Sequence, residues 1–255
     1  MDSDKRIDPW MYRLPGEFFF LLLSLTILLL IGWIFSLVDF YVFVFLLVVG
    51  LVYVRLQQAQ YLGNGLRIFG GQFPELFEIF KEQAKKLGLN KAGLYVVQDP
   101  YLNAHALGIT SCTVVLTSAL VEQLSHRELA FVIGHELGHY QAGHTKITSL
   151  INPLGSNNPF SGLIFGLWAR RAEYSGDRCG LVLTKDIDSA ISSLMKMSVG
   201  KELFKKVNMT GFVHQIAESK HRWVAMSELL SDHPLLVNRI QHLVNFWEKR
   251  FKINS

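Results

Sequence analysis

The stretch His135-Glu136-Leu137-Gly138-His139 has the spacing H-E-x-x-H, which is typical of a zinc-binding helix. Residues four apart lie on one face of a helix, so both imidazoles can reach one metal ion. Glu136 lies beside them, where its carboxylate can accept a proton from a water molecule at the metal. The flanking residues favour a helix, because Ser125 and Glu128 have capping-box spacing and Gly143 is a suitable stop. The stretch therefore predicts a metal-dependent hydrolytic site.

A hydrolytic zinc site needs a third protein ligand and an open position for water. Glu173 and Asp177 form an E-x-x-x-D pattern inside a helix predicted from Asn158-Pro159 to about Leu183, so their carboxylates share a face. Glu173 is expected to complete the metal site. Asp177 is expected to accept the other ring N–H of one metal-binding histidine. The alternative is an acidic, solvated helix face paired with nearby arginines.

His144 is an alternative third ligand, because some zinc peptidases use a third histidine after a glycine in H-E-x-x-H-x-x-G-x-x-H. The spacing here differs, since His144 lies five residues after His139 rather than six. A continuing helix would also turn His144 about 140° away from the metal face. We therefore expect His144 to be a surface residue or a residue that supports a ligand.

The oxyanion of the transition state needs a donor besides the metal. His233-Pro234 opens the last predicted helix, and Arg239 lies on its second turn. A histidine at a helix N-terminus is expected to be neutral, which suits a hydrogen-bond donor. Both side chains are candidates, although a proline at a helix start also occurs for purely structural reasons.

Residues Glu17 to Val54 are almost wholly apolar, with Glu17 and Asp39 as the charged residues. One helix of this length would be about 57 Å long, nearly twice the hydrocarbon thickness of a bilayer. Two spans of about 27 Å, Phe18 to Phe35 and Val38 to Val54, fit better, with a turn near Ser36 to Asp39. A signal peptide and a buried soluble hairpin are disfavoured by the length of the stretch and its lack of a polar face.

Charges and aromatic residues near this stretch predict its orientation. The turn carries no Lys or Arg, so both ends of the hairpin are expected in the cytoplasm. The flanking basic residues are Lys5, Arg6, Arg13 and Arg55. Interfacial aromatic residues are expected at one face (Trp10, Tyr12, Tyr53) and at the other (Trp33, Tyr41). The net charge of +4 suits a domain that rests on an anionic membrane face.

The remaining segments alternate between helix and strand signals. Pro74 to Leu87 predicts an amphipathic helix. Strands are expected at Gly93 to Val97, at Thr113 to Thr117, and around Ala104 to Thr110. The C-terminal part is expected to be helical, with breaks near Thr184–Asp188, Gly200, Gly211 and Ser231–Pro234. Cys112 and Cys179 are expected to be reduced, small core residues.

From about Tyr61 to Leu243 the chain resembles the HtpX-like and CAAX-prenyl-protease family of membrane-associated gluzincin metallopeptidases. The resemblance rests on an ordered set of motifs rather than on any single one. These are Asn64-Gly65, Pro74-Glu75-Leu76-Phe77, Asn103-Ala104-His105-Ala106-Leu107-Gly108, Leu116-Thr117, the H-E-x-x-H stretch, Glu173 to Asp177, His233-Pro234 and Arg239-Ile240.

The resemblance implies an α+β zincin fold of the minimal gluzincin type, mostly helical with a small twisted sheet against the metal helix. The resemblance agrees with the ligand set predicted above, in which His135, His139 and Glu173 bind one Zn²⁺ per chain. It places His233 and Arg239 near the oxyanion. It also implies that an edge strand pairs with the substrate backbone. That strand comprises Asn103, Ala104, His105, Ala106, Leu107 and Gly108.

The chain departs from the family pattern at three points. His105 replaces an aromatic residue and either changes a substrate contact or points to solvent. Gly176 replaces the usual alanine, at a helix cost of about 1 kcal/mol. Thr145 to Ala172 is too short for the two further spans of HtpX-type members, although Leu163 to Trp168 could touch the membrane. The substrate range of the many-spanning relatives is therefore not expected to transfer directly.

We expect an N-terminal lead (1–16), a two-helix transmembrane hairpin (17–55) and a zinc metallopeptidase domain (56–255). The expected function is endopeptidase activity in membrane-protein quality control, with Glu136 as general base. Partners are a membrane-associated peptide or protein and the bilayer, and not nucleic acid; the oligomeric state is not predicted. Prenyl-peptide processing is disfavoured because it needs a larger membrane chamber. The alternative is a non-proteolytic zinc-site scaffold or membrane adaptor, for which an intact Glu136 would serve no purpose.

Overall fold

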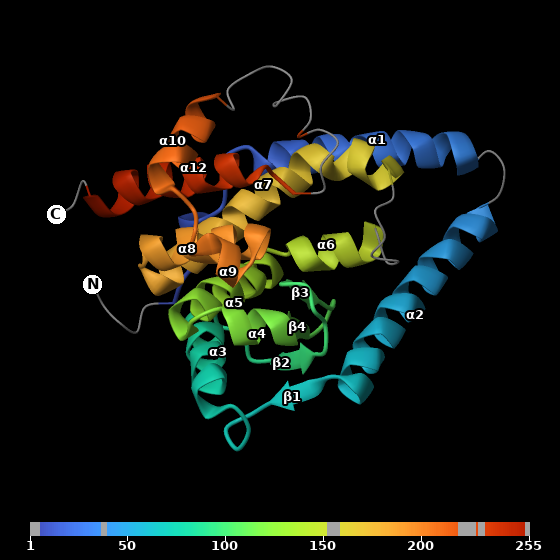
Figure 1. The fold of residues 1–255 in the computed structure, drawn as a ribbon. Helices are drawn as coiled ribbons and strands as arrows, with labels where there is room; N and C mark the ends of the chain where they lie inside the picture. The colour runs from blue at the N-terminus through green and yellow to red at the C-terminus, as the bar shows by residue number, and fades with distance from the viewer. Residues whose placement is uncertain (1–5, 37–39, 152–158, 219–227, 229–232, 253–255) are drawn as a thin grey trace.

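The computed structural model describes residues 6–36, 40–151, 159–218, 228 and 233–252 (Figure 1). The described chain is mostly helical and contains one four-stranded sheet. Its elements are η1 (Pro9–Met11), α1 (Glu17–Ser36), α2 (Phe40–Asn64), β1 (Leu66–Ile68), α3 (Pro74–Lys86), β2 (Ala92–Val97), β3 (Ala104–Leu107), β4 (Cys112–Thr117), α4 (Ser118–Gln123), α5 (His126–Gln141), α6 (His144–Ile151), α7 (Pro159–Thr184), α8 (Ile187–Val199), α9 (Lys201–Phe204), α10 (Met209–Glu218), α12 (Leu236–Trp247) and η3 (Glu248–Lys252).

The sheet has the strand order β1-β2-β4-β3. β2 and β4 are parallel, with Ala92 opposite Cys112, and both outer strands pair antiparallel. Every residue of β4 is buried, which explains the apolar run from Val114 to Leu116 at its centre. β3 is a terminal strand and also contacts α5, so one edge of the sheet lies beside the metal helix.

α5 and α7 form the centre of the fold, and both were predicted. The capping box of Ser125 and Glu128 is present at the start of α5, and Gly143 follows its end with a positive φ of 84°. α7 runs past Glu173 and Asp177 to Thr184, as expected, whereas its predicted cap Asn158 lies outside the described residues.

Glycines allow these two helices to approach closely. A Cβ atom at Gly138 of α5 would lie 2.6 Å from the Cβ atom of Cys179 on α7. A Cβ atom at Gly180 would lie 2.6 Å from the backbone oxygen of Phe131. Neither position tolerates a larger side chain without a shift of its neighbours. The close crossing brings the carboxylates of α7 within reach of the histidines of α5.

α1 lies along α7, as Figure 1 shows, and the two helices share a small apolar cluster. The cluster consists of Phe165, Trp168 and Ala172 of α7, with Phe20, Leu21 and Leu25 of α1 and Ile147, Ile164 and Ala169 around it. Other apolar side chains of α1 are exposed, among them Leu29 at 73%. Within the described residues, one helical window, Glu17–Ile34, is long and apolar enough to cross a membrane.

The second expected span starts at Val38, outside the described residues, so the two-span hairpin stays a prediction. α2 continues to Asn64, ten residues past the expected end at Val54. Its C-terminal part contacts the loop between β3 and β4, because Arg55 donates to the Thr110 hydroxyl at 2.9 Å. The second helix therefore leads directly into the sheet.

The N-terminal lead is docked on the protein. Tyr12 is only 1% exposed, and its hydroxyl lies 3.2 Å from the Gly138 carbonyl oxygen and 2.9 Å from Oε1 of Gln141. The expectation of Tyr12 at a membrane interface is wrong, because the phenol ring is buried and its polar end bonds to α5. Trp10, in contrast, is exposed.

Several boundaries differ from expectation. β1 was not predicted, since three residues are too short for a periodic signal. β3 ends at Leu107 rather than near Thr110. The expected break at Gly211 is wrong because α10 runs through it, after an irregular segment at 205–208. Cys112 and Cys179 are free and buried, as expected.

Candidate metal centre

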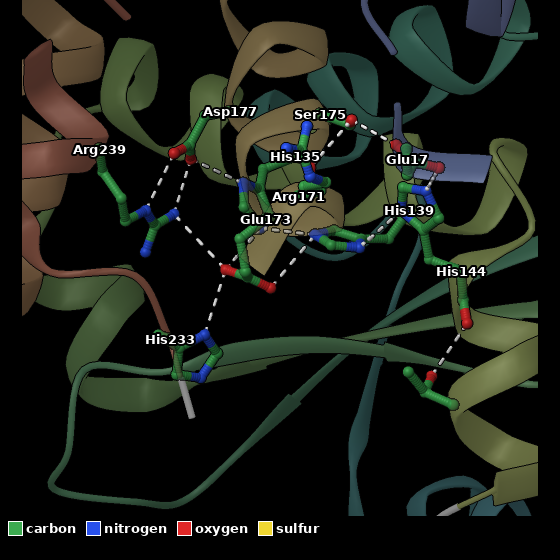
Figure 2. Close-up of polar contacts among 11 residues, drawn as sticks. Glu17, His135, His139, His144, Arg171, Glu173, Ser175, Asp177, His233 and Arg239 are labelled. Atoms are coloured by element: carbon green, nitrogen blue, oxygen red, sulfur yellow. Dashed lines mark hydrogen bonds and ion pairs between the residues drawn. The ribbon is translucent and has the colours of Figure 1, made fainter. Parts of the chain in front are cut away.

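Three side chains from α5 and α7 converge on one point (Figure 2). The Nε2 atoms of His135 and His139 are 2.9 Å apart. The carboxylate oxygens of Glu173 lie 3.7 Å from Nε2 of His135 and 3.5 Å from Nε2 of His139. Tetrahedral zinc with bonds of about 2.0–2.1 Å sets its ligand atoms roughly 3.3 Å apart. The two imidazoles and the carboxylate therefore fit a zinc ion both in spacing and in donor type.

The charge states of two of these groups suit metal binding. Burial lowers the pKa of His139 well below its usual value, with the neighbouring His135 acting in the same direction. Burial alone would raise the pKa of Glu173, but His233 and the two histidines outweigh it and hold that pKa well below its usual value. A neutral imidazole and an ionised carboxylate are the forms that bind zinc.

Asp177 connects His135 to α12. His135 donates from Nδ1 to Oδ1 of Asp177 at 3.0 Å. Arg239 donates two hydrogen bonds to the same carboxylate, at 2.6 and 2.9 Å. Burial alone would lower the pKa of His135, but the hydrogen bond to Asp177 and the Glu173 carboxylate outweigh it and raise that pKa. Arg239 lies in the first turn of α12 rather than the second, and its guanidinium is 3.8 Å from Glu173.

His233 borders the same site from the other side. Its Nδ1 atom lies 3.1 Å from Oε2 of Glu173, and its side chain is 67% exposed. The Glu173 carboxylate raises the pKa of His233. The expected bias toward a neutral ring is wrong, because α12 begins only at Leu236 and the contacting carboxylate dominates.

Glu136 faces a cleft of about 510 Å³ that also contains the three converging side chains. Burial raises the pKa of Glu136, and the charge of Glu173 adds to this effect. The charges of His135 and His233 and a hydrogen bond with the Ala106 backbone act in the opposite direction without outweighing burial. Glu136 is therefore a buried carboxylate with a raised proton affinity, next to the metal position and next to β3.

β3 forms one wall of this cleft. It pairs with β4 along one edge, and in the described sheet no strand pairs with its other edge. The strand comprises Ala104, His105, Ala106 and Leu107, whereas Asn103 and Gly108 flank it. An unpaired strand edge beside a metal position is a suitable place for an extended peptide.

Two of the three departures from the family pattern, His105 and Gly176, have structural explanations. His105 is packed against Tyr61 of α2, with its Nε2 atom 3.1 Å from the phenol oxygen, and burial lowers its pKa. Gly176 lies against the metal-facing histidines, since a Cβ atom there would be 2.6 Å from Nε2 of His139. The glycine lets the α7 backbone lie directly on the two rings.

His144 is not a surface residue, since it is only 2% exposed. Its Nδ1 atom lies 3.1 Å from Nδ1 of His139, and its Nε2 atom lies 2.7 Å from Oε1 of Glu17. The rotation expected for a continuing helix does not apply, because Gly143 separates α5 from α6. Glu17 was not expected near the site. Its signal in the sequence is a lone carboxylate at the start of an apolar run.

The family model for Peptidase family M48 matches residues 71–246, which include β2 to β4, α5, Glu173 and Arg239. This chain belongs to peptidase family M48. The M48 match begins at residue 71, after α1 and α2, so Glu17 lies outside it.

Named relatives agree with this M48 assignment. The chain is 27% identical over 216 residues to the plastoglobule-localized metallopeptidase 48 of Arabidopsis thaliana, covering 76% of this chain and 62% of that protein. It is 25% identical to a protease HtpX homolog of Streptococcus uberis, covering 68% and 73%. A Helicobacter acinonychis HtpX homolog is 30% identical, covering 59% of each chain. The match thus spans less than two thirds of two of these relatives.

One solved structure shares the M48 fold. The crystal structure of S. mikatae Ste24p superposes with a TM-score of 0.53 and 19% identity, covering 91% of this chain and 67% of that one. The two chains therefore share a fold over most of the length of this chain.

Proposed function

We propose that this chain is a membrane-anchored, zinc-dependent endopeptidase. The observation that carries the proposal is the convergence of His135, His139 and Glu173, with Glu136 beside them in the same cleft. Membership of a peptidase family supports the hydrolytic reaction. The edge of β3 with which no described strand pairs supports a peptide substrate bound in extended form.

Residues of the cleft have separate roles in the proposed hydrolysis. A bound zinc ion supplies Lewis acidity and lowers the pKa of water to about 7. Glu136 takes the proton of the attacking water and passes it to the leaving amine. His233 and Arg239 border the cleft and are the candidates for stabilising the oxyanion.

We place the catalytic domain at residues 56–255 and the membrane anchor at 17–55, with both ends in the cytoplasm. Exposed apolar side chains on α1 and α2 support the anchor. Membrane-associated proteins are then the accessible substrates, which supports a role in membrane-protein quality control. Prenyl-peptide processing and a non-proteolytic scaffold are the competing functions.

The test combines metal analysis with proteolysis on the full chain in detergent. Wild type is expected to hold one zinc and to cleave casein in a chelator-sensitive manner. Glu136→Gln is expected to hold zinc and lose about 10²–10⁴-fold in turnover, because an amide cannot accept a proton. Residual activity within about tenfold of wild type would remove Glu136 as the base. Zinc binding without proteolysis in wild type would favour the scaffold.

A further inference from the structure

The side chain of Glu17 is buried, although it begins the apolar helix α1. Its Oε2 atom accepts a hydrogen bond from the Ser175 hydroxyl at 2.6 Å, and its Oε1 atom lies 3.0 Å from Nε of Arg13. Oε1 also lies 2.7 Å from Nε2 of His144. A carboxylate that is 2% exposed requires such partners, since burial of an unpaired charge is costly. The start of α1 is therefore held at one defined position beside α7.

His144 connects this carboxylate to His139. Figure 2 shows the two rings lying between Glu17 and Glu173. Nδ1 of His144 is 3.1 Å from Nδ1 of His139, the ring nitrogen that does not face Glu173. The rings meet edge to face, with centroids 5.1 Å apart, and Trp168 packs edge to face on His144. The orientation of His144 is thus fixed on several sides.

One assignment of ring protons satisfies the hydrogen bonds that run from His139 through His144 to Glu17. If His139 binds a metal through Nε2, its neutral ring carries the hydrogen on Nδ1 and donates to Nδ1 of His144. His144 then carries its hydrogen on Nε2 and donates to the Glu17 carboxylate. His135 has the equivalent arrangement with one step fewer, since it donates directly to Asp177. Such partners fix ring orientation and raise the basicity of a metal-binding histidine.

His144 is not arranged as a fourth metal-binding residue. The group of described residues whose ligand atoms converge consists of His135, His139 and Glu173. Nε2 of His144 is directed to Glu17, away from that group, and Nδ1 contacts the far edge of the His139 ring.

We propose that Glu17, acting through His144, orients His139 for zinc binding, so that the start of α1 is part of the metal centre. The inference rests on the proposed zinc site. It extends that site beyond the M48 match, which begins at residue 71. It also connects the proposed metal site, through His139 and His144, to the helix that we assign to the membrane. Glu17 and His144 are positioning residues, because neither touches the reacting atoms.

The experiment measures zinc affinity by chelator competition on the full chain in detergent. Glu17→Ala is expected to weaken zinc binding about 10–100-fold, with Glu17→Gln in between because its amide oxygen still accepts from His144. His144→Asn keeps a polar atom near His139, whereas His144→Gln keeps one near Glu17. Each variant breaks one of the two hydrogen bonds of the Glu17–His144–His139 relay, so both are expected to weaken zinc binding. These two variants and Glu17→Gln decide the matter if Glu17→Ala does not fold.

Glu128→Gln is the matched control. Like Glu17, Glu128 is a buried carboxylate that accepts hydrogen bonds from a hydroxyl, that of Ser192, and from a cation, Lys196. Unlike Glu17, it lies at the start of α5 and does not contact His144 or His139 in these hydrogen bonds. It is expected to lose stability and keep wild-type zinc affinity. Wild-type affinity in folded Glu17 and His144 variants, or an equal loss in Glu128→Gln, would overturn the inference. If His139→Ala bound zinc as wild type does, the proposed metal site itself would fall, and the relay with it.

Discussion

The guanidinium of Arg239 donates two parallel hydrogen bonds to the carboxylate of Asp177, from Nη2 at 2.6 Å and from Nε at 2.9 Å. The pair is nearly enclosed, with side chains 16% and 1% exposed. Because Oδ1 of Asp177 also accepts from His135, the pair holds a metal-facing ring in place. Arg239 therefore acts on the site through Asp177, and also lies 3.8 Å from Glu173.

Asp177→Asn is expected to weaken zinc binding about 10–100-fold without abolishing it. The amide keeps the shape of the carboxylate but removes the charge that Arg239 and His135 share. Chelator competition and casein turnover measure the two effects. A fully wild-type Asp177→Asn enzyme would return Asp177 to the role of an ordinary helix residue.

Arg239→Lys separates two roles for the arginine. A lysine cannot form the two parallel bonds to Asp177, so zinc affinity is expected to fall together with kcat. If Arg239 instead served only the oxyanion, kcat would fall while zinc affinity stayed at the wild-type value. Measuring both quantities on the same preparation decides between positioning and direct stabilisation.

The elements that carry the site were predictable because their signals are local. The capping box fixed the start of α5, and the four-residue spacings placed each pair of side chains on one helix face. The contact between Glu17 and His144 was not predictable, because it joins residues 127 positions apart. It depends on how α1 packs on α7 and on the turn at Gly143, and periodicity reports neither. Tyr12 shows the same limit. As an aromatic residue near an apolar stretch it was expected at a membrane interface, but its hydroxyl bonds to α5.

Gly180→Ala is expected to destabilise the fold by about 1–3 kcal/mol. The added methyl would lie 2.6 Å from the Phe131 backbone oxygen and 2.9 Å from its ring, so α5 and α7 must separate. Gly211→Ala in α10 is the control, since the nearest atom to its Cβ, in the Asn208 side chain just before the helix, is 3.7 Å away. The control is expected to be neutral or stabilising, because alanine favours helix. Equal melting temperatures for the two variants would contradict the close-packing argument.

The ion pair of Glu128 and Lys196 predicts a pH-dependent contribution to stability. Burial alone would raise the pKa of Glu128, but hydrogen bonds from Lys196, Ser192 and Ser125 outweigh it and lower that pKa. The contribution is therefore full above the unfolded pKa of about 4.3 and is lost as the pH falls through the folded pKa. Glu128→Gln is expected to cost about 1.5–3 kcal/mol at pH 7 and nearly nothing in strong acid. A cost that did not change between pH 7 and pH 3 would show that the charge plays no part.

The last prediction concerns the membrane. α1 begins at Glu17, which contacts His144 and Ser175 of the catalytic domain, and α2 leads directly into β1. The start of α1 and the end of α2 therefore both lie at the catalytic domain. A bilayer crossed by the pair would then leave that domain on one side and the turn on the other. The absence of Lys and Arg from residues 36–39 predicts that the domain side is cytoplasmic.

Single-cysteine labelling at Ser3, Ser36 and Ser255 tests this arrangement, in a background with Cys112 and Cys179 replaced by alanine. Ser3→Cys and Ser255→Cys are expected to react from the cytoplasmic face, and Ser36→Cys from the opposite face. Each labelled variant should retain zinc, which shows that the domain is folded when it reacts. Labelling of the two termini from opposite faces would establish a single tilted span. That result would also separate Glu17 from His144 across the bilayer, and so it cannot coexist with their contact at 2.7 Å.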